Sequence, residues 1–330
     1  MTCCTLGRAR TRLPCCRTIY VGCNRHEYAI VSNAPLFAAI ETGGSKTVFA
    51  IGNADGELLA CARCPTGDPQ PTLAQALRFL RDAATRHGAL HGVGIASFGP
   101  LHLHPQQPAY GHLGATPKPG WSGFDLLGSV QKQLSLPIAL DTDVNAAALA
   151  EQRWGAGRDL DPLVYVTVGT GIGGGVMVHG QPLHGLLHAE LGHLRPRRHP
   201  DDLHFNGICP FHGDCLEGLA SGPAIIARHG ASLAQLPADH PAWRIQADYL
   251  GQLCAQITLA LSPQRILFGG GVMQQRALFD PIRARTQHWL GGYIGALDCA
   301  AALRDYVVPA ALEPNAGILG ALALAIDAAR

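Results

Sequence analysis

A group of metal-binding side chains lies in a loop rich in Pro, Gly and Asp. Cys209, His212 and Cys215 follow one another at three-residue intervals, and His193 precedes them. Thiolate and imidazole groups at this spacing are typical ligands of tetrahedral zinc. Because four protein ligands close the coordination shell, such a zinc would be structural: it would tether residues 195–207 and would not activate water. The alternative is that reduced cysteines pack there as small apolar side chains.

Three glycine-rich turns, at residues 41–46, 169–175 and 269–272, each follow a short apolar run. Glycine lets bare backbone N–H groups approach a ligand closely, and an anion such as phosphate is the usual partner. The alternative is that these are plain hairpin turns. The first two turns share one strand–turn–strand plan, which predicts two related halves that offer glycine turns to one nucleotide. The candidate nucleotide contacts are Gly43, Gly44, Ser45, Lys46, Thr170, Gly171, Gly173, Gly269, Gly270 and Gly271.

A pair of carboxylates follows the predicted strand at residues 137–140. Asp141 and Asp143 stand where that strand gives way to a predicted helix, and ligands of open α/β sheets bind at such strand ends. A positive helix end would favour the ionised form of Asp143. The alternative is that Asp143 only caps the helix.

Length, charge and composition exclude several classes of protein. The chain has 330 residues and a net charge of +1, which gives no general electrostatic reason to bind nucleic acid or an acidic membrane. No apolar run reaches the roughly 20 residues that a membrane helix needs. Few aromatic residues and many glycines favour a compact α/β enzyme. The cysteines form no disulfide framework, so we expect a soluble protein in a reducing compartment, the cytoplasm.

Periodicity predicts the elements that must position these residues. Residues 1–35 are rich in Cys and Arg and are left out of the fold as a disordered extension, although a transit-like peptide or a mis-assigned start would look similar. The long loop after residue 97, which ends at Trp121, is expected to bind a ligand. Strands are predicted at residues 36–40, 47–51, 57–63, 92–97, 137–140, 163–168, 176–178, 266–268 and 306–309, and helices at 72–87, 124–134, 146–154, 218–229, 242–261, 280–290 and 313–329.

Together these motifs identify a family. From Leu36 to its C-terminus the chain resembles the ROK sugar kinases, and within them the bacterial fructokinases. The motifs that carry the resemblance are Glu41 to Lys46, Asp141-Thr142-Asp143-Val144-Asn145, Gly169 to Gly175, Glu190-Leu191-Gly192-His193, and Cys209 to Gly218.

The resemblance implies an α/β fold of the two-lobed, actin-like (ribonuclease H-like) kind with a duplicated core. Residues 36–145 would form a small lobe, against which a C-terminal helix near residues 313–330 packs, and residues 146–312 a large lobe with the zinc loop. ATP, Mg²⁺ and sugar would meet in the cleft, with Asp143 as general base, and the protein would form a homodimer. The implied zinc ligands are His193, Cys209, His212 and Cys215. The implied sugar contacts are Gly99, Pro100, Thr116, Thr142, Asp143, Glu190, His193 and Glu217.

Physical chemistry agrees with these roles. Phosphoryl transfer mainly needs positioning and charge neutralisation, which glycine turns and Mg²⁺ supply, and a carboxylate can accept the proton of the attacking hydroxyl. Glu190 and Glu217 lie beside metal ligands in sequence, so a zinc would hold the loops that carry both carboxylates. The alternative is that they are solvent-exposed loop acids.

The chain departs from the wider family at three positions. Glu41, Thr142 and His212 stand where many members have Asp, Asn and Cys, and all three resemble the fructokinase branch. The first expectation is therefore ATP-dependent formation of fructose 6-phosphate. The alternatives are a kinase for glucose, mannose or N-acetylmannosamine, a zinc-clamped binding protein without turnover, and a sugar-sensing repressor. A repressor would need a helix-turn-helix, for which residues 1–35 are too short.

Overall fold

A computed structural model describes residues 34–330. The predicted disordered extension, residues 1–35, therefore lies almost wholly outside the described residues. The strands are β1 (Leu36–Thr42), β2 (Lys46–Asn53), β3 (Leu58–Pro65), β4 (Leu90–Ser97), β5 (Ile138–Thr142), β6 (Leu163–Val168), β7 (Ile172–Val178), β8 (Gln181–Pro182), β9 (Arg265–Gly269) and β10 (Val307–Pro309). The helices are α1 (Pro69–His87), α2 (Leu126–Gln131), α3 (Asp143–Trp154), α4 (Leu216–Ala220), α5 (Gly222–His229), α6 (Pro241–Leu261), α7 (Phe279–Leu290), α8 (Ala300–Tyr306) and α9 (Ala316–Ala328).

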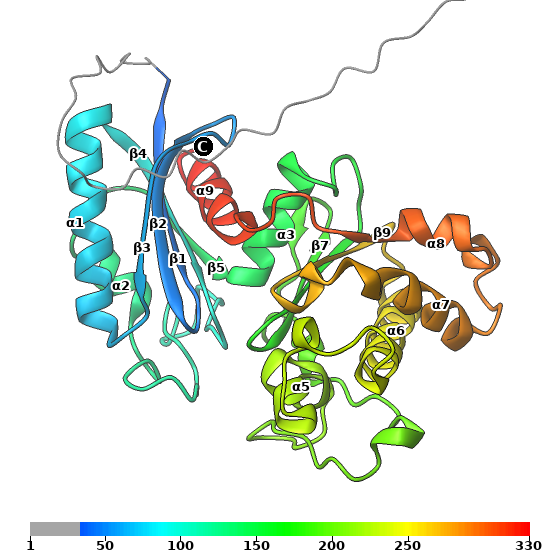
Figure 1. Cartoon of the computed structure of the whole chain (residues 1–330). Coiled ribbons are helices and arrows are strands. Elements are labelled where there is room, and N and C mark those ends of the chain that lie inside the picture. Colours follow the sequence, from blue (N-terminus) through cyan, green and yellow to red (C-terminus); the bar gives the residue numbers. More distant parts are fainter. Residues whose placement is uncertain (1–33) are drawn as a thin grey trace, which may run out of the picture.

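Two five-stranded sheets repeat one topology. The first has the order β3-β2-β1-β4-β5, with β1, β2 and β3 antiparallel and β4 and β5 added in parallel. The second has the order β10-β9-β6-β7-β8, again with a meander of three strands and two parallel additions. The glycine turns at residues 43–45 and 169–171 join the first two strands of each meander. This confirms the predicted two-lobed fold with a duplicated core (Figure 1).

Helices α3 and α9 each pack against the sheet that they do not follow in the chain. Helix α3 follows the first sheet in the chain but contacts β6 and β7, whereas α9 follows the second sheet and contacts β1 and β4. Both helices contact each other between the sheets, where α9 is drawn in red (Figure 1). The close approach needs glycines, because a side chain at Gly94 would overlap Ala321 of α9, and one at Gly320 would overlap Ala146 of α3.

Apolar cores flank both sheets. One core lies between the first sheet and α1, a second contains α3 and α9 between the sheets, and a third lies between the second sheet and α6 and α7. Most predicted elements are present, with some differences. The helix predicted at residues 218–229 is broken at Ser221, whose extended backbone (ψ 162°) ends α4 and whose hydroxyl caps α5. Helix α8, which directly precedes β10, and the two-residue strand β8 were not predicted. Among the described residues, no helix is both long and apolar enough to span a membrane.

Candidate active site

Asp143 occupies the first turn of α3, directly after β5. The cap of this helix is Thr142, whose hydroxyl accepts a hydrogen bond from the Asn145 amide at 3.2 Å. The carboxylate of Asp143 accepts a hydrogen bond from the Val144 amide at 2.9 Å. The reading of Asp143 as a mere cap is therefore wrong, because its neighbour fills that position and leaves this carboxylate available for other chemistry.

Burial raises the pKa of Asp143 to about 6, against the lowering effect of its backbone hydrogen bonds. The helix dipole was expected to favour the anion, but the loss of solvation outweighs it. A carboxylate with this pKa is mostly ionised at neutral pH and still accepts a proton readily, as a general base must.

Other carboxylates share the electrostatic environment of Asp143. Burial and the negative charge of Asp143 raise the pKa of Glu41 to about 7, although Lys46 opposes this shift. Burial, Glu217 and Asp143 together raise the pKa of Glu190 to about 7. Glu41 lies in β1 of the first sheet and Asp143 at the start of α3, whereas Glu190 and Glu217 follow strands of the second sheet in the chain. This concentration of negative charge suits a site that takes up cations or hydroxyl donors.

Replacing Glu41 by Gln is expected to stabilise the ligand-free protein above neutral pH. The folded protein holds the Glu41 proton more tightly than the unfolded chain, so the free energy of unfolding falls as pH rises between about 4.5 and 7. Gln does not ionise and escapes this loss. We expect a gain in Tm of roughly 2–5 °C at pH 8 and little change at pH 4.5. Glu57→Gln, at an exposed residue, is the matched control. Equal Tm values at pH 8 would contradict the argument.

A hydrogen-bonded cluster beside Asp143 was not predicted from the sequence. Asp141 is buried and accepts hydrogen bonds from the Thr142 amide at 2.7 Å and the Asn145 side chain at 2.8 Å. Its other oxygen lies 2.9 Å from Nε2 of His184, which comes from the second lobe, and this hydrogen bond raises the pKa of His184. Asp141 thus fixes the start of α3 and joins the two lobes.

His188 makes a second link between the lobes. Its buried ring accepts a hydrogen bond from the Leu101 amide at 3.1 Å, and its Nδ1 lies 3.5 Å from Glu190. Burial lowers its pKa, which favours the neutral form that can accept this bond. The ring packs where a side chain at Gly99 would stand. Gly99 and Pro100, joined by a cis peptide bond, are thereby held beside Glu190.

The first glycine turn contacts the long loop of its own lobe. The Gly43 amide donates to the Lys46 carbonyl at 2.9 Å and closes the turn. The side chain of Lys118 donates to the Gly44 carbonyl at 2.8 Å. Gly44, Ser45 and Lys46 are exposed. Their carbonyls accept hydrogen bonds from Lys118, Thr66 and Gly43, so the turn would meet a ligand through its amides.

Residues 116–121 form the closing part of the long loop. The Thr116 backbone exchanges two hydrogen bonds with the Ser122 hydroxyl, at 3.0 and 2.9 Å. The buried ring of Trp121 donates to the Gly67 carbonyl at 2.9 Å. The loop is thus anchored at its end and tied to the first glycine turn through Lys118.

The second and third glycine turns are neighbours. A side chain at Gly169 would stand 3.8 Å from the Gly271 amide. The Gly270 amide donates to Glu313 at 3.2 Å, and Gly270 has a φ of +90°, a conformation that favours glycine. The residue between Gly169 and Gly171 is Thr170, which is exposed. These two turns can approach one ligand together.

Gly173 is a strand residue and does not belong to the glycine turn itself. It lies inside β7 and leaves room for Val144 of α3, so its lack of a side chain serves packing next to Asp143. Gly171, in the turn itself, lies against Glu217, whose carboxylate accepts a hydrogen bond from the Ile172 amide at 2.9 Å. The candidate sugar residue Glu217 therefore touches the candidate phosphate turn.

The four predicted metal ligands converge. Their ligand atoms all lie within 4.8 Å of one another. Nδ1 of His193 lies 3.5 Å from the Cys215 sulfur and 3.9 Å from the Cys209 sulfur, which in turn lies 3.7 Å from Nδ1 of His212. Ligands that surround a zinc ion tetrahedrally at about 2.0–2.3 Å are roughly 3.3–3.8 Å apart, so the donor set fits a tetrahedral metal. Nε2 of His193 points the other way, 3.9 Å from Glu190.

Known proteins are similar to this chain in sequence and in fold. The chain is 42% identical over 290 residues to a fructokinase of Pediococcus pentosaceus, covering 88% of this chain and 97% of the relative. It is 42% identical over 296 residues to a fructokinase of Zymomonas mobilis, covering 89% and 97%. The crystal structure of a ROK hexokinase from Thermus thermophilus has the same fold, with a TM-score of 0.72, 24% identity, and coverage of 88% of this chain and 98% of that one. The model of the ROK family matches residues 37–328. The chain therefore belongs to the ROK family.

Proposed function

We propose that this protein transfers the γ-phosphoryl group of ATP to D-fructose and forms fructose 6-phosphate. The observation that supports the proposal is a partly buried carboxylate with a raised pKa, Asp143, whose charge is felt by Glu41 and Glu190, in a chain whose relatives are named fructokinases. ATP, Mg²⁺ and sugar fit this arrangement, because exposed turn amides suit phosphates and clustered carboxylates suit hydroxyls and cations.

Asp143 would accept the proton of the sugar 6-hydroxyl as that oxygen forms its bond to phosphorus and the bond to the β-phosphate oxygen breaks. The amides of residues 43–46 and 169–171 would hold the phosphates, and Gly269 to Gly271 would approach the nucleoside. Mg²⁺, when bound, neutralises phosphate charge. Gly99, Pro100, Thr116, Glu190 and Glu217 would orient the sugar, whereas Thr142, the remaining candidate, is buried and its hydroxyl caps α3.

The metal cluster would hold zinc in a structural role. With His193, Cys209, His212 and Cys215 as ligands no position remains for water, so the metal would order loops and take no part in proton transfer. His193 can serve two purposes, because Nδ1 faces the cluster while Nε2 faces Glu190. The metal would thereby fix a ring that contacts the sugar.

The direct test is an ADP-production assay with Mg²⁺ and ATP across fructose, glucose, mannose and N-acetylmannosamine. We expect kcat/KM for fructose to exceed that for the other sugars by at least about tenfold, since a polar site discriminates strongly against hydroxyls that it cannot pair. A preference for another hexose would change the proposed substrate but leave the proposed kinase activity in place. No turnover on any sugar by folded, zinc-loaded protein would refute the proposal.

A further inference from the structure

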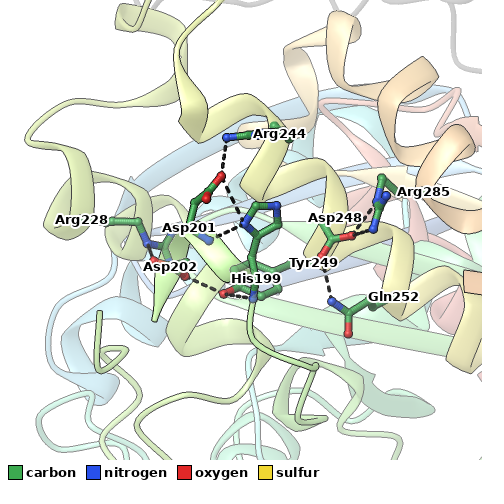
Figure 2. Close-up of polar contacts among 9 residues, drawn as sticks. All are labelled: His199, Asp201, Asp202, Arg228, Arg244, Asp248, Tyr249, Gln252 and Arg285. Atoms are coloured by element: carbon green, nitrogen blue, oxygen red, sulfur yellow. Dashed lines mark hydrogen bonds and ion pairs between the residues drawn. The ribbon is translucent and has the colours of Figure 1, made fainter. Parts of the chain in front are cut away.

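The loop between the metal ligands His193 and Cys209 carries a second anchor that contains no metal ligand. Figure 2 shows its polar contacts with α5 and α6. At its centre lies Asp202, whose side chain is 2% exposed. A carboxylate this deeply buried needs close partners, because the loss of solvation is otherwise prohibitive.

Asp202 has two such partners. The hydroxyl of Tyr249, on α6, donates to one carboxylate oxygen at 2.6 Å. Nε of Arg228, on α5, lies 2.7 Å from the other oxygen, and the Arg228 side chain is itself only 7% exposed. The guanidinium also lies over the ring of Phe205 at 4.3 Å, so a second residue of the loop contacts Arg228. Buried pairs of this kind tolerate the loss of one partner poorly.

Further contacts extend the anchor along the loop. The side-chain amide of Gln252, on α6, accepts a hydrogen bond from the Arg197 amide at 2.7 Å and donates to the Arg197 carbonyl at 2.9 Å. The His199 amide donates to the Tyr249 hydroxyl at 3.3 Å. Gln252 also donates to Asp248, which pairs with Arg285 of α7 (Figure 2). Arg197, His199 and Asp202 are therefore bound to α5 and α6 by partly or fully buried contacts, and Asp201 adds an exposed ion pair with Arg244 of α6.

The same charge pair is connected to the candidate sugar site through α4. Besides meeting Asp202, Arg228 donates to the Leu219 carbonyl in α4 at 2.7 Å. Helix α4 carries Glu217, which accepts a hydrogen bond from the Ile172 amide. A displacement of Arg228 would be passed through one short helix to a carboxylate of the site.

We propose that Asp202 is a positioning residue: with Arg228 and Tyr249 it fixes residues 197–202 and α4 independently of the metal, and so sets the position of Glu217. The loop then has one anchor at its metal ligands and another at α5 and α6. The second part of the proposal, on Glu217, rests on the proposed sugar-binding function.

The first test follows hydrogen exchange of the full chain with and without a zinc chelator. In the wild type, the segment 197–202 is expected to keep its protection after chelation, while 208–216 loses it, because the amides of Arg197 and His199 have acceptors outside the metal cluster. Asp202→Asn should deprotect 197–202 even with zinc bound. Equal loss in both segments of the chelated wild type would show that the metal is the only anchor and overturn the proposal. This readout needs no turnover.

The second test compares Asp202→Asn with its neighbour. Asp201 forms an exposed pair with Arg244, with side chains 48% and 62% exposed, so Asp201→Asn is a matched control. For Asp202→Asn we expect KM for the sugar to rise about tenfold, kcat to stay within about threefold, and zinc content to remain that of the wild type. Asp201→Asn should resemble the wild type.

Tyr249→Phe keeps the ring and the charge pair, and it serves if Asp202→Asn does not fold. It should raise the same KM about threefold and deprotect 197–202 in part. If the anchor variants matched Asp201→Asn in KM and exchange, Asp202 would have no positioning role. Changed exchange with an unchanged KM would overturn the link to Glu217.

Discussion

Asp143→Asn is expected to lower kcat by about 10²–10⁴-fold, the range usual for a general base. Asn has the same shape and can still meet the Val144 amide, so KM for sugar and ATP should stay within about threefold. Tm at pH 8 should not fall, because the substitution removes a charge whose burial is unfavourable. Steady-state assays, with Tm and zinc content as controls, test this. A variant that retains full activity would exclude Asp143 as the base.

The pH dependence of the wild type gives an independent check. Because burial raises the pKa of Asp143 to about 6, kcat/KM should be constant above this value and fall about tenfold per unit below it. The residual activity of Asp143→Asn should lack this dependence. If the same acidic limb remained in the variant, another group would carry the titration.

The second large effect is expected from Cys215→Ser. Loss of a thiolate ligand should reduce bound zinc from about one per chain to under a tenth, and lower Tm by roughly 5–10 °C, since metal binding contributes to folding. Because His193 then loses the metal at Nδ1 and with it a fixed ring orientation, KM for the sugar should rise at least about tenfold. Metal analysis, Tm and kinetics provide the readouts.

Cys299→Ser is the matched control for that substitution. Cys299 is exposed at the start of α8, outside the metal cluster, and a serine can take over its contact with the Ala302 amide. This variant should have the zinc content, the Tm and the kinetic constants of the wild type. A Cys215→Ser protein with full zinc content would remove Cys215 from the ligand set, and a metal-free protein with normal kinetics would show that the cluster does not order the sugar site.

Local sequence patterns predicted the parts of the fold that depend on local physics. Runs such as residues 163–168 are apolar and β-branched, and they are buried strands. The duplicated strand–turn–strand plan predicted the duplicated topology, since the same turn chemistry imposes the same meander twice. The metal cluster could also be predicted from the sequence, because three of its ligands lie within seven residues of chain, 209–215.

Contacts between residues that are far apart in the sequence could not be predicted from local patterns. His184 and His188 are two among many histidines in the sequence, and only the fold brings them to Asp141 and Leu101. Asp202 looked like an ordinary loop acid because its partners lie on α5 and α6. The break at Ser221 was missed although the sequence carries a signal for it: a serine followed by Gly222 and Pro223 is typical of the start of a new helix.

The exchanged position of α9 bears on how the chain is made. Strands β1 and β4 leave the ribosome long before residues 316–328, which cover one face of their sheet. Until then Phe37 and Ala39 lack the partners from α9 with which they form a core in the finished protein. Domains usually fold in the order of synthesis, starting at the N-terminus. Here we expect the lobe whose strands are synthesised first to be the last to complete its core, because α9 is made last.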